Sequence, residues 1–167
     1  AMAGGTLAAL VVGRNDPGFV HNGALAGLVA VCAGSNVMHP VGALATGAMA
    51  GALFVWAFNF MQNKLKIDDS LDVIAVHGVG GILGTLILPI LASLGPLSPG
   101  LGDVTIAQQA WVQVQGVVVV VAWSVAVTYL IIKVASYFMN VRAKPEAEIE
   151  GLDMHVHGER AWHGISG

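Results

Sequence analysis

Charged side chains are scarce in this chain of 167 residues, of which they make up 10%. A soluble globular domain usually carries about 25%, so the composition excludes an ordinary water-soluble enzyme. The formal net charge is -3 at pH 7, and no stretch interleaves basic with aromatic side chains, which excludes a strongly basic nucleic-acid binder. Cys32 is the only cysteine. No intrachain disulfide can therefore form, and cysteine use says nothing about the redox compartment.

The chain contains long apolar intervals without charged residues, and 56% of its residues are apolar. Charged residues are missing from three intervals: Asp16 to Lys64, Asp72 to Asp103, and Asp103 to Lys133. A bilayer core is crossed by about 20 apolar residues in a helix, so the first interval can hold two crossings and each of the others one. A spanning segment must satisfy its own backbone hydrogen bonds, and the alternating pattern of a transmembrane barrel is absent. We therefore predict an all-α integral membrane protein.

The predicted membrane domain covers residues 1–140, and a polar tail covers residues 141–167. The expected spans are residues 1–12, 22–33, 41–62, 73–94 and 110–139. The first is too short to cross, because twelve helical residues are only about 18 Å long. We interpret it as the end of a span whose beginning is missing. The chain opens without the basic region of a cleavable signal peptide.

The lysines and arginines predict the topology. With four full crossings between them, all seven fall on one side of the membrane: Arg14, Lys64, Lys66, Lys133, Arg142, Lys144 and Arg160. The opposite loops, residues 34–41 and 95–109, contain neither residue type. Because lysine and arginine are retained on the cytoplasmic side, the tail is predicted to be cytoplasmic.

Glycines four residues apart occur in three of the apolar segments. The pairs are Gly23 and Gly27, Gly47 and Gly51, and Gly80 and Gly84. This spacing of small residues lets helix backbones approach closely in lipid. It favours a compact helix bundle, and it would also suit helices that crowd around a narrow path.

The stretch Asp68–Gly84 is the most informative in the sequence. It opens with three carboxylates and a serine before an apolar run. At a helix start, side-chain oxygens accept hydrogen bonds from free backbone N–H groups, and negative charge is favourable. Asp69 or Ser70 is therefore predicted to be the N-cap residue, with Asp72 in the first turn. Capping and anchoring at the membrane interface is a sufficient explanation for these acids.

His77 lies one to two turns inside this apolar segment, and the next ionisable residue along the chain is Asp103. An ionisable side chain at membrane depth is costly and is by default a functional-site hypothesis. Imidazole suits proton handling, because it both donates and accepts. At helical spacing, His77 shares one stripe with Val73, Gly81, Gly84 and Leu88. The alternative is a structural histidine that is hydrogen-bonded to a neighbouring helix.

Three segments resemble the ammonium transporter (Amt/MEP/Rh) family. Asp68–Gly84, with Asp-Asp-x-x-Asp followed by Val-His-Gly-Val-Gly-Gly-Ile-Leu-Gly, resembles the family's tenth transmembrane helix. Asn22–Ala30 is similar to its eighth helix. Gly151–Trp162 is similar to its cytoplasmic tail, where the last position is more usually tyrosine. The similarity therefore extends over nearly the whole chain.

The resemblance implies an eleven-helix fold of two inverted five-helix repeats plus a long last helix, assembled as a homotrimer with one pore per subunit. This chain would be the second-repeat part, with about four full transmembrane helices and a truncated N-terminal one. His77 would be one of two pore histidines that conduct ammonium or ammonia past a hydrophobic constriction. Val73 and Gly81 would line the pore, and Asp69, Ser70 and Asp72 would form the helix start near the pore.

The first repeat of that fold is not in this sequence, and neither are the partner histidine, the Asp-x-Ala-Gly signature or the aromatic recruiting vestibule. His21 borders the Arg14 loop and His39 precedes Pro40, so neither replaces the partner histidine. Because transporter sites lie between repeats, a pore cannot be completed from these residues alone.

The tail would contact a P-II type signal protein or couple subunits, again by resemblance, through Gly151, Leu152, Asp153, His157, Gly158 and Glu159. His155 and His157 are expected to be solvated rather than to bind a metal, and no cofactor is expected. An alternative function is a transport-deficient ammonium sensor or partner-recruiting module. An enzyme is not expected, because no nucleophile–base pair or phosphate loop is visible. The implied location is the plasma membrane.

Overall fold

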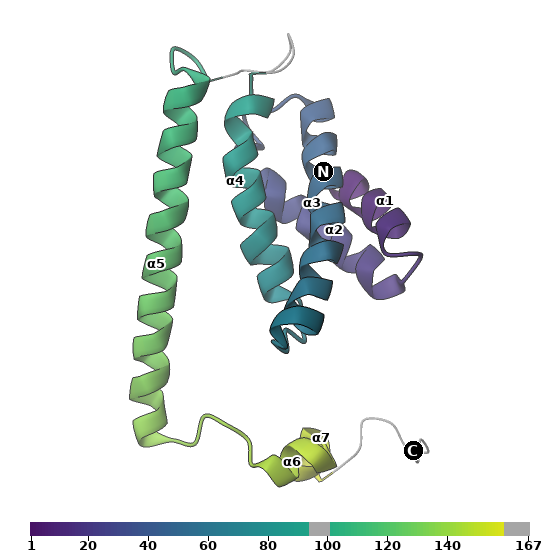
Figure 1. Cartoon of the computed structure of the whole chain (residues 1–167), viewed down its shortest axis with the longest axis vertical. Helices are drawn as coiled ribbons and strands as arrows, with labels where there is room; N and C mark the ends of the chain where they lie inside the picture. Colours follow the sequence, from purple (N-terminus) through teal and green to yellow (C-terminus); the bar gives the residue numbers. More distant parts are fainter. Residues whose placement is uncertain (94–100, 159–167) are drawn as a thin grey trace. The chain divides into compact units, whose positions relative to one another are not determined.

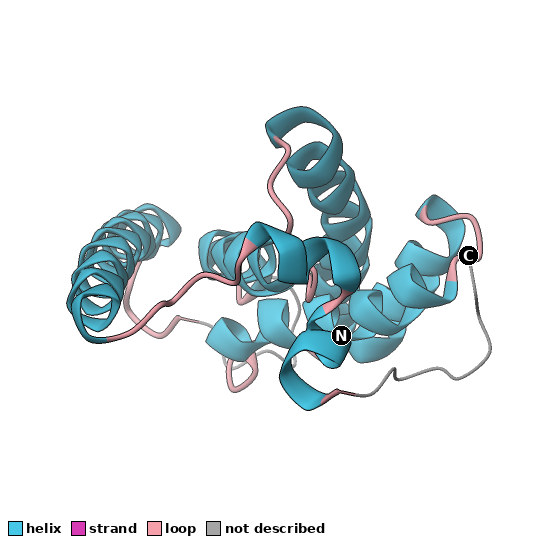
Figure 2. Ribbon diagram, turned by 90° about the horizontal axis from the view of Figure 1, so that it is seen from below, coloured by secondary structure: helices cyan, strands magenta, loops and turns pink. Residues whose placement is uncertain are grey.

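Four helices of this protein are long and apolar enough to cross a membrane. The structure is a computed structural model that describes residues 1–93 and 101–158, and within those ranges every regular element is helical (Figures 1 and 2). The four helices are Pro17–Gly34, Pro40–Leu65, Ile74–Leu91 and Ile106–Phe138. They confirm the predicted all-α membrane class, because each is a continuous apolar helix of at least 18 residues.

The helical elements of the described residues are given in chain order. They are α1 (Met2–Val12), α2 (Pro17–Val31), the 3₁₀ turn η1 (Cys32–Gly34), α3 (Pro40–Phe60), the π-helical η2 (Met61–Leu65) and η3 (Ile74–Val79), α4 (Gly80–Leu91), α5 (Ile106–Phe138), α6 (Pro145–Glu150) and α7 (Leu152–His157). The chain divides into two compact units, Ala1–Val119 and Val120–Gly167.

Two helices begin earlier than the apolar pattern predicts. α2 begins at Pro17 rather than at residue 22, because the Asp16 carboxylate accepts hydrogen bonds from the backbone N–H groups of Gly18 (2.8 Å) and Phe19 (3.3 Å). The Pro-Gly pair that indicates a loop is here the first helical turn, where proline loses no hydrogen bond. α5 begins at Ile106 rather than at residue 110, with the Thr105 hydroxyl accepting from the Gln108 N–H (3.2 Å). Residue 94, the expected end of the fourth span, lies outside the described residues.

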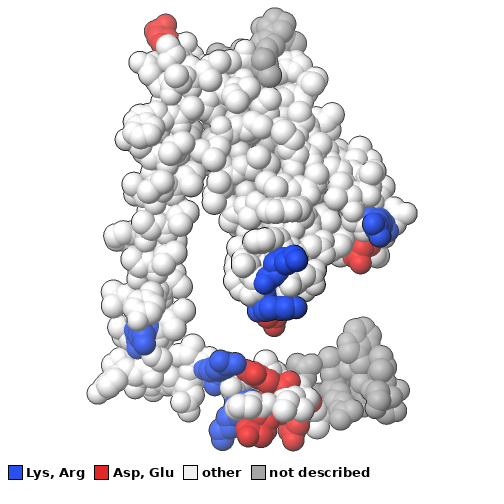
Figure 3. All heavy atoms as spheres, viewed as in Figure 1, with Lys and Arg blue, Asp and Glu red and all other residues white. Residues whose placement is uncertain are grey.

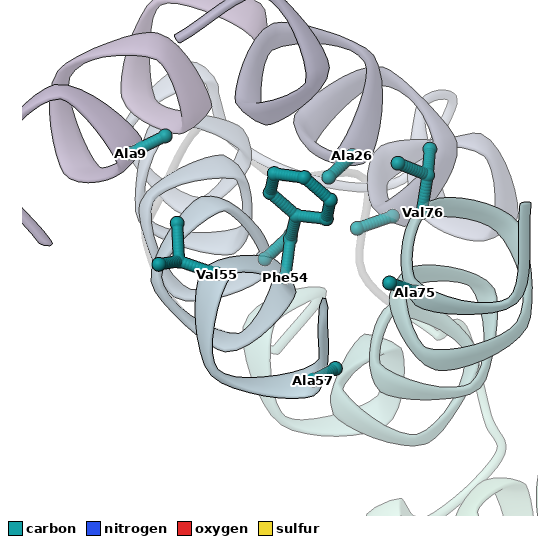
Figure 4. Packing of buried hydrophobic residues seen from close by; sticks show 9 residues of the cluster. Ala9, Ala26, Phe54, Val55, Ala57, Ala75 and Val76 are labelled. Carbon is teal, nitrogen blue, oxygen red and sulfur yellow. The ribbon is translucent and has the colours of Figure 1, made fainter. Parts of the chain in front are cut away.

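The interior of the first unit is built largely from small side chains (Figure 4). Its buried cluster consists of Ala9, Ala26, Ala30, Ala50, Phe54, Val55, Ala57, Ala75 and Val76. Phe54 is the largest member and meets the ring of Phe19 edge-on, with 6.0 Å between the ring centroids. Small side chains let the helices approach closely, so van der Waals contact between backbones replaces the hydrophobic driving force that lipid does not supply.

The six glycines of the predicted close-packing pairs are all buried, which confirms that their spacing marks helix contacts. The closest approach is at Gly84 in α4, where an added Cβ would lie 1.8 Å from the carbonyl oxygen of Ala30 in α2. Only glycine fits such a contact between two helix backbones.

On the face shown in Figure 3, charged side chains gather near the ends of the long helices and at α6. In the second unit, α6 and α7 follow α5, and the Arg142 guanidinium lies 3.5 Å from the Glu148 carboxylate. Both side chains are exposed, so this ion pair contributes little to stability.

Candidate functional site

The start of the His77 helix is capped by one aspartate. An Asp69 carboxylate oxygen accepts from the Val73 N–H (2.9 Å), and the other accepts from the N–H groups of Ile74 (2.7 Å) and Ala75 (3.4 Å). Ser70 lies in the intervening turn and is exposed. Of the two residues expected at the cap, Asp69 therefore makes the hydrogen bonds. Its negative charge is also stabilising there, because the N-terminus is the positive end of the helix dipole.

Asp72 does not lie in the first helical turn, as the sequence suggested, but just before it. Its backbone has a φ of +57°, in the left-handed region, which turns its side chain toward α2. There it is 8% exposed and accepts a hydrogen bond of 2.6 Å from the side-chain amide of Asn22. Sequence reasoning missed Asn22 as a site residue. The signal that could have found it is a polar amide at the start of an otherwise apolar stretch.

A π-helical segment, η3, carries His77. Each hydrogen bond of a π-helix closes a wider turn than in an α-helix, so each residue advances the rotation less. The predicted stripe is open at one end and covered at the other: Val73 and His77 are exposed and Gly81 is half-buried, whereas Gly84 and Leu88 are buried. The backbone of Ala30 in α2 covers the stripe at Gly84.

His77 lies on the open side of its segment, and its neighbours Ala75 and Val76 belong to the buried cluster. Among the described residues, no hydrogen bond joins its imidazole to another helix. The structure thus presents His77 as an exposed side chain of this unit. A group that donates with one nitrogen and accepts with the other can pass a proton along a chain of hydrogen bonds.

The predicted tail residues frame a short helix. Gly151 (φ +96°) and Gly158 (φ +71°) flank α7, in which Leu152 and His157 are exposed. Asp153 is also in α7, and Glu159 lies outside the described residues. Within the part of the chain that the structure describes, no group of three or more metal-ligating side chains comes together.

Asp72 predicts a pH dependence of stability. Burial, and then the neighbouring charge of Asp69, raise the pKa of the Asp72 carboxyl above its ordinary value, while the hydrogen bond from Asn22 opposes the rise. The folded protein therefore holds this proton more tightly than the unfolded chain. The contribution of this proton to the free energy of unfolding is present below the ordinary pKa of a carboxyl, about 4. It is lost as pH rises through the raised pKa.

Asp72→Asn removes this titration, so we expect the variant to unfold at a higher temperature than the unchanged protein at pH 7. The difference should shrink as pH falls toward about 4, where both side chains are neutral. Thermal unfolding of the purified protein in detergent at a series of pH values measures it. A variant whose advantage stayed constant across that range would contradict the role of Asp72.

Comparison with known proteins finds one family over most of the chain. The model of the Ammonium Transporter Family matches residues 1–162. The chain is 37% identical to Ammonium transporter Amt1 of Haloferax mediterranei, with 94% of this chain and 30% of that protein aligned. It is 34% identical to the Ammonium transporter of Corynebacterium glutamicum, with 98% and 37% aligned. It thus spans about a third of the length of these relatives.

A solved structure, that of a Sensor Amt Protein, has a similar fold. Its TM-score is 0.80 at 34% sequence identity, over 93% of this chain and 39% of that one.

Proposed function

Because the chain belongs to the ammonium transporter family, we propose that it forms one wall of a transmembrane path for ammonium or ammonia and that His77 stands in this path. It is a multi-pass membrane protein. The observation that carries the proposal is the exposed imidazole of His77, on the open face of a helix that is otherwise apolar. A polar group in such a place is expensive unless it serves a substrate or a partner.

The chemistry follows from the groups beside His77. Val73 and Gly81 lie one turn away on either side, one apolar and the other without a side chain. An apolar wall disfavours hydrated cations, because a charge that leaves water loses its solvation. A nitrogen that enters this wall can hydrogen-bond to one imidazole nitrogen, while the second remains free to pass the proton on.

The proposed whole protein is larger than this chain. The relatives extend well beyond the aligned part, and in our proposal that remainder supplies the second pore histidine and the first repeat. The same proposal includes a homotrimer in the plasma membrane with its C-terminus in the cytoplasm. The clustering of all seven lysines and arginines on one side supports this orientation.

Ammonium-evoked current in liposomes tests the proposed transport. The complete protein that carries this chain should give a current above that of empty liposomes, with sodium and potassium giving none. A complete, folded protein that produces no ammonium-dependent current or uptake would contradict the transport function.

A second candidate is a sensor or partner-recruiting module, favoured by the similarity to the Sensor Amt Protein and by the exposed helix α7. In this proposal a P-II type signal protein binds the tail. Deleting residues 145–167 should then abolish capture of that partner while the membrane helices stay folded. Partner capture that survives the deletion would remove the tail from the proposed interface.

A further inference from the structure

The start of the His77 helix needs hydrogen-bond acceptors from outside its own turns. A helix leaves its first N–H groups without partners within the helix. Asp69 alone accepts from three of them, at Val73, Ile74 and Ala75. The main-chain carbonyl of Asp72 accepts from the Val76 N–H at 2.7 Å. The two aspartates together therefore supply the acceptors for the first N–H groups of this helix.

Asp72 also ties this start to a second helix. Its carboxylate accepts from Asn22 of α2 at 2.6 Å, a bond between residues 50 positions apart. Asp72 is buried, and its left-handed backbone is unfavourable for a residue with a Cβ atom. Such a conformation persists only where the surroundings hold it. The bond to Asn22 is the side-chain contact that does so.

His77 points away from the closed part of its helix. Gly84 and Leu88, further along the same helix, are buried. Gly84 meets the backbone of Ala30 in α2, so the helix is closed there. His77 belongs to the π-helical segment before Gly80, and its imidazole is exposed.

We propose that Asn22 and Asp72 are positioning residues: their hydrogen bond, together with the Asp69 cap, fixes the start of the His77 helix against α2 and so presents His77 on the open face. The effect of this pair on transport rests on the proposed function, which places His77 in the path. The orientation of residue 77 does not, and it can be measured by itself.

Thiol accessibility at position 77 tests the orientation. In the complete protein with Cys32→Ala, a single His77→Cys replacement is treated with a methanethiosulfonate reagent in liposomes. Adding Asn22→Ala should slow the modification about tenfold or more, the shift produced by losing one hydrogen bond to a charged group. The exchange Asn22→Asp with Asp72→Asn restores an amide–carboxylate pair and should restore the rate. Ser93→Cys, exposed beyond the other end of α4, is the matched control and should react equally in all backgrounds.

Asp72→Gly keeps the test decisive if Asn22→Ala does not fold. Glycine adopts a positive φ freely, so this variant removes the side-chain bond without backbone strain, and it too should slow modification at position 77. Equal rates at position 77 in all folded variants would overturn the positioning role.

Transport separates this proposal from the proposed function. With His77 in place, Asn22→Ala should reduce the ammonium-evoked current per folded protein. The double variant Asn22→Asp with Asp72→Asn should restore the current. A slowed thiol reaction with unchanged current would confirm the positioning role and contradict the place of His77 in the path.

Discussion

Replacing His77 with alanine should reduce the ammonium-evoked current of the complete protein in liposomes by about 100-fold, or change the ions that it carries. A positioned proton-transfer group typically contributes about 100-fold or more to a rate. The residues one turn away cannot take over the hydrogen bond, because Val73 has an apolar side chain and Gly81 has none. The variant should fold normally, since the imidazole is exposed and makes no hydrogen bond to the described residues that its loss would break.

His21→Ala is the matched control, because His21 is also an exposed histidine on a membrane-capable helix but lies within the first turns of α2. Its current and ion selectivity should equal those of the unchanged protein. If His77→Ala carried the same current with the same selectivity, the place of His77 in the path would be wrong.

Gly84→Ala should destabilise the bundle by about 3 kcal/mol or more, at the upper end of the cost of overpacking. The added Cβ would lie 1.8 Å from the carbonyl oxygen of Ala30 and 2.5 Å from its carbonyl carbon. Both are backbone atoms, so no side-chain rotation can relieve the clash, and α2 and α4 must separate. The loss should appear as a lower unfolding temperature in detergent and a lower yield of folded protein.

Gly80→Ala provides the control four residues earlier on the same helix. The added Cβ would lie 3.5 Å from the carbonyl oxygen of Ala26, an ordinary contact with the same partner helix. Alanine also favours the helix over glycine by about 1 kcal/mol, so this variant should be neutral or slightly more stable. Equal unfolding temperatures for the two variants would contradict the close contact of α2 and α4.

The helical membrane class was predictable from the sequence because it depends on composition over whole segments. An uncharged apolar run longer than the bilayer is thick has few structures available, whatever its neighbours are. The close-packing glycines were predictable for a similar reason, since their spacing of four places each pair on one helix face. The exact helix starts were not, because Asp16 and Thr105 cap helices through bonds that hydropathy does not report.

His77 was identified by the sequence alone, since an imidazole in an apolar run is conspicuous without any coordinates. Its orientation was decided only by the tertiary structure. The bond from Asn22 to Asp72 joins residues 50 positions apart, and no local pattern connects them. Periodicity relates His77 to its neighbours on the same helix, but it does not report which side of that helix α2 covers. The sequence by itself thus determined which residue is chemically exceptional, and the packing of α2 against η3 and α4 decided the face on which it lies.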